Sequence, residues 1–128
     1  MNGVNMSLRN GVTEMSKRHG WMWFFRYVDE PNLQLLLNFK KHLLVRELKE
    51  KTIHEYLKEV SNWMKYLQDK DIKTLEATDN DLKEYLDCME VSDARKTRVL
   101  SVLSIFYSHN KKKKYCKENI VEKYKINN

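Results

Sequence analysis

Glycine and proline are almost absent from this sequence. Its 128 residues contain three glycines and one proline, Pro31. A sheet of several strands needs more turn-forming residues than this chain has, so the scarcity argues against a turn-rich β protein and favours long helices. A chain of this length fits one domain with a modest core. We therefore predict an all-α fold.

Cysteine and long apolar runs are also scarce. Cys88 and Cys116 stand alone, without the spacing of a zinc site, and the four histidines are scattered. We predict no metal site and no cofactor, and expect reduced thiols in a cytoplasmic protein. No apolar run approaches the roughly 20 residues that span a bilayer. The bulky stretch at 21–28 contains Arg26 and lacks a signal-peptide cleavage site, so no membrane partner is expected.

Positive charge is concentrated at one end of the sequence. The net charge is +6, and residues 92–128 hold ten basic and three acidic residues, giving +7. Residues 1–91 hold fourteen basic and fifteen acidic residues, giving −1. One interpretation is a directed basic surface, and the other is a solvated, lysine-rich tail.

Apolar periodicity predicts two helices in the first half of the chain. The first, at 32–48, starts after Pro31, and its inward face is Leu33, Leu36, Leu37, Lys40, Leu43 and Leu44. The second, at 50–68, has an apolar stripe of Ile53, Tyr56, Leu57, Val60, Trp63, Met64 and Leu67. Its predicted solvent face is Glu55, Lys58, Glu59, Asn62 and Lys65.

Helix-start signals and periodicity predict further helices. Thr78 and Asp81 make a start like a capping box within 74–89; its apolar face is Leu82, Tyr85, Leu86 and Met89, with Cys88 packed beside it. Ser92 can cap a fourth helix at 94–107, with Asp93 in the first turn and a buried stripe of Val99, Val102, Leu103 and Phe106. A short last helix is expected at 117–124. Residues 1–31 should form a largely irregular, partly disordered extension before a helical domain at 32–128.

The predicted fourth helix carries basic side chains at its N-terminus, which is the positive end of the helix dipole. Arg95, Lys96 and Arg98 crowd the first turn and a half. Cations at a helix N-terminus are unfavourable by about 0.3–1 kcal/mol each. A second stripe permits close approach of another helix or of a nucleic-acid backbone: Thr97, Ser101, Ser104 and Ser108. For Ser104 and Ser108 we prefer the structural interpretation.

Three stretches follow one another along the chain. In "KEKTIHEYLKEVSNWMKYL", Thr52 is followed four residues later by Tyr56 and eleven later by Trp63. The second stretch is "IKTLEATDNDLKEYL", and in the third, "KTRVLSVLSIFY", Arg98 precedes an L-S-x-L run. In this order, the three stretches resemble the core-binding domain of tyrosine recombinases, the phage integrase and Xer-type family. The closing "YCKENIVEKYK" is similar to the family's exit segment, which usually reads Asn-Pro, whereas Asn119 here precedes Ile120. The likeness covers about three-quarters of the chain.

The resemblance implies a small orthogonal SAM-like bundle of four to five helices. It also implies a domain that clamps one face of double-stranded DNA, with the N-termini of the second and fourth helices near the backbone and major groove. Cations and hydroxyls there would contact phosphates. The candidate DNA-binding residues are Lys51, Thr52, Arg95, Lys96, Thr97, Arg98, Ser101, Lys111, Lys112, Lys113 and Lys114. For the four lysines, an equal alternative is favourable charge at a helix C-terminus.

The chemistry of that family needs two arginines, a lysine, a His-x-x-Arg and a nucleophilic tyrosine in a separate C-terminal domain. This sequence has no His-x-x-Arg, because His42 and Arg46 are four residues apart. We predict no catalytic residue and expect a non-catalytic fragment or truncated product of a mobile element. The function expected is DNA binding for a site-specific recombinase, with other recombinase protomers as a second class of partner. The alternative is a helical protein–protein interaction module, which the acidic segment 76–90 would suit.

Overall fold

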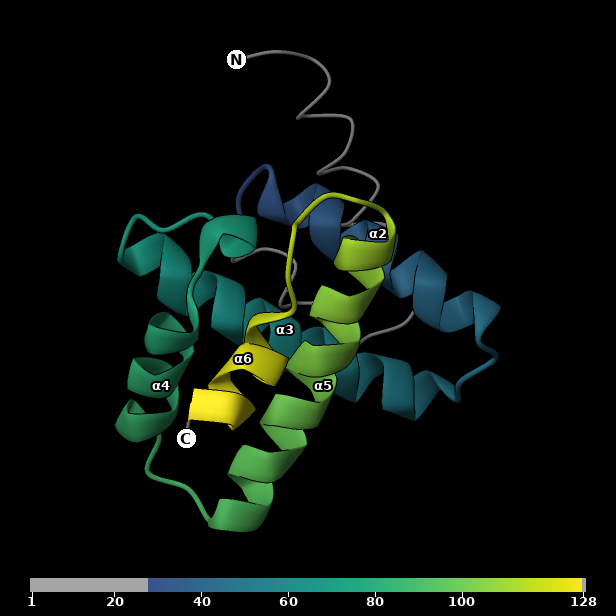
Figure 1. Ribbon diagram of the computed structural model, residues 1–128. Coiled ribbons are helices and arrows are strands. Elements are labelled where there is room, and N and C mark those ends of the chain that lie inside the picture. The colour runs from purple at the N-terminus through teal and green to yellow at the C-terminus, as the bar shows by residue number, and fades with distance from the viewer. Residues whose placement is uncertain (1–27, 128) are drawn as a thin grey trace. The chain divides into compact units, whose positions relative to one another are not determined.

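The computed structural model describes residues 28–127 (Figure 1). The elements in this part of the chain are α2 (Asn32–Val45), α3 (Glu50–Asp69), the 3₁₀ helix η2 (Thr74–Glu76), α4 (Asp79–Cys88), α5 (Asp93–Lys112) and α6 (Ile120–Asn127). No strand occurs among the described residues. The all-α prediction is therefore confirmed, whereas the predicted extension at 1–31 lies almost entirely outside the described residues.

The chain divides into two compact units, with the boundary between Ser61 and Asn62, inside α3. Among the described residues, the first unit contains α2 and the beginning of α3. The second contains the end of α3, η2, α4, α5 and α6. Each unit is described by itself below.

The first unit buries one face of each of its helices. Its buried apolar residues are Val28, Leu33, Leu36, Phe39, Leu43, Ile53, Leu57 and Val60. The face predicted for the first helix is partly wrong, because Leu44 is 53% exposed while Phe39 is fully buried. Leu36, Phe39 and Leu43 share a spacing of three and four residues, so the buried face is centred on them. Leu44 lies in the last turn, where the helix stops.

One charged residue of the first unit was placed on the wrong face. Glu59 was predicted on the solvent face of the second helix, but it is only 3% exposed. Its neighbour Ser61 is equally buried, and its hydroxyl donates to the Lys58 carbonyl at 2.8 Å. The buried face of α3 is therefore wider than its apolar stripe, and helical periodicity of apolar residues alone does not detect the added polar positions.

Three helices end at left-handed residues that are not glycine. The backbone φ angles of Glu47, Asp71 and Lys114, after α2, α3 and α5, are 58°, 58° and 64°. After α3 and α5 the chain forms Schellman motifs, in which the N–H groups of Ile72 and Tyr115 donate to carbonyls five residues earlier, each at 2.9 Å. Glycine usually takes this position because it has no Cβ. The turn at Glu47 also ends α2 at Val45, earlier than the predicted 48.

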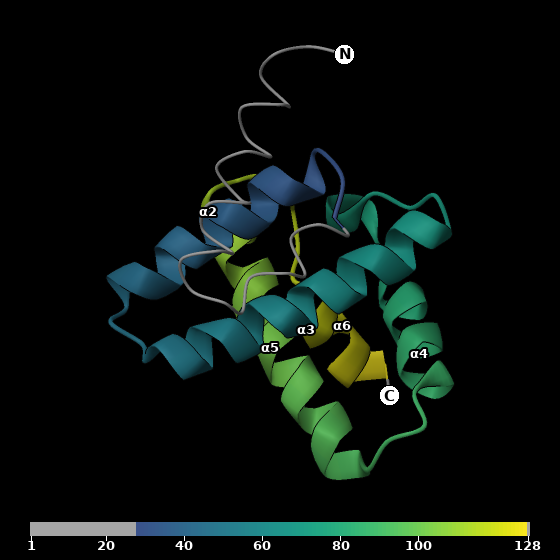
Figure 2. The same ribbon diagram turned by 180° about the vertical axis from the view of Figure 1, so that it is seen from behind.

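The second unit is built around α6. Figures 1 and 2 show α6 between α4 and α5 from both sides. The predicted stripes of the third and fourth helices are confirmed, except that Met89 is only half-buried. The apolar core is Trp63, Met64, Leu67, Ala77, Leu82, Tyr85, Leu86, Val99, Val102, Leu103, Phe106, Tyr107, Ile120 and Val121.

A chain of buried hydrogen bonds crosses this core. Trp63 Nε1 donates to the Tyr107 hydroxyl at 2.8 Å, and that hydroxyl donates to the Thr74 carbonyl at 2.7 Å. Burial holds the pKa of the Tyr107 hydroxyl well above its usual value, although the bond from Trp63 acts in the opposite direction. The Tyr85 ring packs against Trp63 with 5.0 Å between ring centroids. The end of α3, η2 and α5 are thus joined by satisfied polar groups.

Asn119 fastens the beginning of α6. Its side-chain oxygen accepts from the Val121 N–H at 3.0 Å, and its Nδ2 donates to the Ser104 carbonyl at 3.0 Å and hydroxyl at 3.3 Å. The helix therefore begins at Ile120, not at the predicted 117, and the structural interpretation of Ser104 is confirmed. Ile120 follows the cap at the first helical position, where proline is tolerated.

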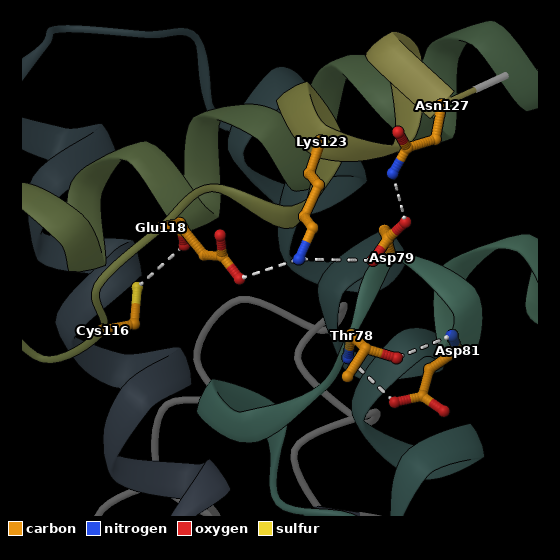
Figure 3. Close-up of polar contacts among 7 residues, drawn as sticks. All are labelled: Thr78, Asp79, Asp81, Cys116, Glu118, Lys123 and Asn127. Carbon is orange, nitrogen blue, oxygen red and sulfur yellow. Dashed lines mark hydrogen bonds and ion pairs between the residues drawn. The ribbon is translucent and has the colours of Figure 1, made fainter.

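Polar contacts also hold the far end of α6 (Figure 3). Asn127 Nδ2 donates to the Asp79 carboxylate at 3.0 Å, and Lys123 Nζ lies 3.9 Å from the same carboxylate and 3.7 Å from that of Glu118.

Both cysteines are free. Cys88 is exposed, so its predicted packing is wrong: it lies in the last turn of α4, outside the buried stripe. Burial raises the pKa of the Cys116 thiol, which lies 3.5 Å from the Glu118 carbonyl.

Candidate nucleic-acid interface

The beginning of α5 has the predicted cap. Ser92 is in an extended conformation, and its hydroxyl accepts from the Arg95 N–H at 3.2 Å. Asp93 follows in the first turn, where its negative charge complements the helix dipole. The cap explains why a helix forms here, but it does not explain the cations that follow.

The beginning of α4 differs at one position. There Thr78 accepts from the Asp81 N–H at 3.2 Å, and the Asp81 carboxylate accepts from the Thr78 N–H at 2.8 Å (Figure 3). This is a complete capping box. In α5 the corresponding third position is Arg95, which cannot accept a hydrogen bond. Helix α5 therefore has a positively charged side chain at a position where a carboxylate would be stabilising.

Five predicted residues come together on the first turns of α5. Thr97, Arg98 and Ser101 are exposed, while Arg95 and Lys96 are half-buried. Arg98 and Ser101 are three residues apart and share a face of the helix. The structure therefore gathers these cations and hydroxyls at a helix end that already presents partial positive charge.

The two hydroxyls in this group are already donating within the helix. Thr97 Oγ1 donates to the Asp93 carbonyl at 3.0 Å, and Ser101 Oγ donates to the Thr97 carbonyl at 3.1 Å. A phosphate contact by either hydroxyl proton would require exchange of that bond. The cationic side chains are therefore the stronger candidates for binding an anion.

The other predicted residues lie elsewhere. Lys51 is exposed and Thr52 half-buried on the first turn of α3, in the first unit. The four lysines at 111–114 are all exposed at the far end of α5. Lys117 is exposed as well. It was not predicted, although it lies in the same acid-free part of the sequence.

The lysines of the second unit differ in whether they lie beside a carboxylate. One group lies beside carboxylates, at 3.4–3.9 Å: Lys65, Lys70, Lys73, Lys83 and Lys123. By contrast, none of the lysines at 111–114 lies within ion-pair distance of a carboxylate among residues 28–127. Lysines without a carboxylate partner in this part of the chain are therefore most concentrated at the end of α5, and Lys96, Lys117 and Lys125 are the others.

Most of the acidic segment at 76–90 has structural partners. Of its six carboxylates, five cap a helix or face a lysine: Glu76, Asp79, Asp81, Glu84 and Asp87. The interaction-module interpretation considered this segment suitable for a partner surface. Most of its charges are paired or used in a cap inside the second unit.

Within 28–127, no three His, Cys, Asp or Glu side chains form a group that could hold a metal ion. No helix in that part of the chain has the length and apolarity to cross a membrane.

Comparison with known proteins gives one match. The family model described as "Phage integrase, N-terminal SAM-like domain" matches residues 36–114. The matched span runs from within α2 to the end of the lysine run after α5. No curated protein and no solved structure gives a significant match. The predicted resemblance and the SAM-like helical class are thereby confirmed.

Proposed function

Because the chain belongs to the phage integrase N-terminal SAM-like domain family, we propose that it is a non-catalytic, duplex-DNA-binding part of a site-specific tyrosine recombinase. Its main contact is the beginning of α5. The basic residues there offer phosphates both side-chain charge and the positive end of a helix. Other recombinase protomers are the second partner in this proposal.

The observation that carries the proposal is the charge at the start of α5. Arg95 occupies the position where a carboxylate would complete the cap, and Lys96 and Arg98 follow it. Free helices disfavour this arrangement. Phosphate binding would offset that disadvantage, because neutralised phosphates release condensed counterions. The family match supports DNA as the anion, since it is to the N-terminal domain of integrases.

The test is a salt titration of a labelled 20-base-pair duplex by fluorescence anisotropy. We expect weak binding with little sequence preference. Engagement of about four phosphates gives a slope of log affinity against log salt near −3.6. Tight binding that does not respond to salt would contradict this expectation.

A matched pair of variants locates the contact. Lys96→Gln/Arg98→Gln removes two charges from the start of α5, and it should reduce the salt slope by about 1.8. Lys73→Gln/Lys83→Gln removes the same net charge from lysines that face carboxylates, and it should change the slope much less. Equal effects would mean that only net charge matters and that the proposed face is wrong.

The helical interaction module remains the competing function. It becomes the better account if the unaltered chain does not bind duplex DNA at low salt. Its support from the acidic segment is weakened by the capping and ion-pair contacts of Asp79, Asp81 and Glu84. Sedimentation of the chain over a range of concentrations would then detect self-association.

A further inference from the structure

Tyr115 is an exposed aromatic side chain within a run of lysines. It is 54% exposed, whereas every other tyrosine, tryptophan and phenylalanine of residues 28–127 is buried or half-buried. Lys111–Lys114 precede it and Lys117 follows it, and all five lysines are exposed. Among residues 28–127, no aromatic ring and no hydrogen-bonding group engages the Tyr115 side chain. The fold of the second unit therefore does not use this ring.

The backbone on both sides of Tyr115 is nevertheless fixed. The Tyr115 N–H donates to the Asn110 carbonyl at 2.9 Å and closes the turn after α5. Asn110 is itself buried, and its side chain donates to the Phe106 carbonyl at 2.9 Å. On the other side, the Cys116 thiol donates to the Tyr107 carbonyl at 3.9 Å. An ordered turn thus presents the ring, so a ligand would pay little conformational entropy to order it.

The positive charge around the ring has no acidic partner in the described part of the chain. Neither Lys111–Lys114 nor Lys117 lies within ion-pair distance of a carboxylate among residues 28–127. Glu118, the nearest acid in the sequence, lies 3.7 Å from Lys123 of α6. Burial raises the pKa of the Cys116 thiol, and the Lys111 ammonium opposes that shift. The Lys111 charge therefore acts close to the turn that holds the ring.

The ring and the lysines together indicate a class of ligand. Lysines at a helix C-terminus complement the helix dipole, which accounts for the charge but not for the exposed ring. In a duplex each base lies between stacked neighbours, so a side chain reaches the face of a base only when that base leaves the stack. An unpaired nucleotide offers an open base face beside its phosphates. Proteins bind such strands by combining aromatic stacking with positive charge.

We propose that Tyr115, with Lys111–Lys114 and Lys117, binds unpaired nucleotides of single-stranded nucleic acid. The Tyr115 ring stacks on a base, and the lysines contact the neighbouring phosphates. The site has little sequence preference, because every base has a π-face and phosphate contacts carry no sequence information. It lies at the opposite end of α5 from the duplex contact proposed above. The two sites are therefore separable by mutation.

The experiment measures binding by fluorescence anisotropy with labelled probes of equal length. The probes are oligothymidine, oligouridine, a DNA strand of abasic sites, which keeps the phosphates without the bases, and a duplex. The variants are Tyr115→Ala, Tyr115→Phe and Lys112→Gln/Lys113→Gln, with Lys73→Gln/Lys83→Gln as the charge-matched control. All five altered side chains are exposed, and a thermal melt of each variant verifies its fold.

Tyr115→Ala should weaken binding of oligothymidine by about 5- to 150-fold, the size of one base–aromatic stack. It should leave the abasic strand and the duplex unchanged, and Tyr115→Phe should bind like the unaltered chain because it keeps the ring. Lys112→Gln/Lys113→Gln should reduce the salt slope on oligothymidine by about 1.4, and the control by much less. Equal results with oligouridine would extend the site to RNA, and binding of only one strand would name the source of the ligand.

Two results would overturn this inference. A Tyr115→Ala effect that is equal on the oligothymidine and abasic strands, or absent from both, would mean that the ring does not contact a base. Failure of the unaltered chain to bind either oligothymidine or oligouridine would overturn it as well, while duplex binding would still support the proposed function. Conversely, single-strand binding that depends on Tyr115, without duplex binding, would support this inference and contradict the proposed function.

Discussion

The beginnings of α4 and α5 are both capped by a hydroxyl, but the residues at the third position carry opposite charges. Each helix is capped by a hydroxyl, from Thr78 in one and Ser92 in the other, at the same 3.2 Å from the third backbone N–H. In α4 the third residue is Asp81, which returns a hydrogen bond to the cap. In α5 it is Arg95, which adds positive charge instead.

Under the proposed function, the difference separates a requirement of folding from one of DNA binding. The start of α4 follows helix preferences, and it carries the Asp79 carboxylate that holds α6. The start of α5 departs from the same preferences within the same unit. A local departure of this kind is expected where function competes with stability.

Removing the core side chain of Trp63 should destabilise the second unit, which contains both α4 and α5. Trp63 is fully buried and hydrogen-bonded to Tyr107, which ties it to α5. Trp63→Ala should lower the free energy of unfolding by about 3–5 kcal/mol, through lost burial and a cavity. Urea denaturation followed by circular dichroism measures the loss. An unchanged midpoint would show that this side chain does not support the helices of the second unit.

Tyr107→Phe should weaken the attachment of α5 while retaining the ring. It leaves the Trp63 N–H without its acceptor, whereas the Thr74 carbonyl still accepts from the Ala77 N–H at 3.4 Å. With about 1–3 kcal/mol for one buried unsatisfied group, we expect a loss of about 1–3 kcal/mol. The same denaturation assay applies, and a loss well below 1 kcal/mol would show that water replaces the hydroxyl.

This substitution should also change the response to alkaline pH. The folded state raises the Tyr107 pKa, so above pH of about 10 the unfolded chain loses this proton first. Its contribution to stability is complete below that pH and declines above it, by up to about 1.4 kcal/mol per pH unit. The difference between the unaltered chain and Tyr107→Phe should therefore shrink between pH 9 and 11. A constant difference would contradict the buried hydroxyl.

Thr78→Ala tests the complete capping box directly. It removes the hydroxyl that accepts from the Asp81 N–H. The bond from the backbone N–H of residue 78 to the Asp81 carboxylate then stands alone. The expected loss is about 1 kcal/mol. Ser92→Ala at the start of α5 is the matched control, and it should cost less because no reciprocal bond is present. Equal losses would mean that the box adds nothing to the simple cap.

The far end of α5 offers a change that should stabilise the fold. Lys114 has a left-handed backbone with φ of 64°. Lys114→Gly relieves that conformation and should raise the free energy of unfolding by roughly 0.5–1 kcal/mol. DNA affinity should fall slightly through the lost charge. A decrease in stability would show that the lysine makes a contact that outweighs the backbone preference.

Arg95→Glu should make the start of α5 resemble that of α4. A glutamate at this position can complete the box with Ser92 and complement the dipole, so stability should be unchanged or rise by about 0.3–1 kcal/mol. DNA affinity should fall severalfold, because an attraction becomes a repulsion. Thermal melting and anisotropy on the same sample test both. A loss of stability without a loss of affinity would reverse our assignment of Arg95.

Local patterns predicted much of the fold and the Ser92 cap at the start of α5. The capping residues Thr78, Asp81 and Ser92 were identified because a cap bonds to a backbone group within three residues. The stripe of Val99, Leu103 and Phe106 was identified because helical periodicity places them on one face. Both signals act over one or two turns and need no knowledge of the rest of the chain.

Local sequence patterns did not predict other features, because those features depend on distant residues. The burial of Glu59 and the exposure of Cys88 are set by what covers each helix, which apolar spacing does not report. The beginning of α6 is set by Asn119 reaching Ser104, fifteen residues earlier. The ends of α2 and α5 lack the glycine that usually marks a helix stop.

The sequence by itself determined the helical class, the caps, the core stripes and the concentration of positive charge after residue 91. Those properties follow from local hydrogen bonding, periodicity and composition. Charge pairs within one turn, such as Lys65 with Asp69, follow from local spacing, and only the tertiary structure decided the distant pairs. Lysines such as Lys70 and Lys123 meet carboxylates 14 and 44 residues away, whereas Lys111–Lys114 meet none among residues 28–127. Coulomb attraction depends on distance in space, and folding alone sets that distance.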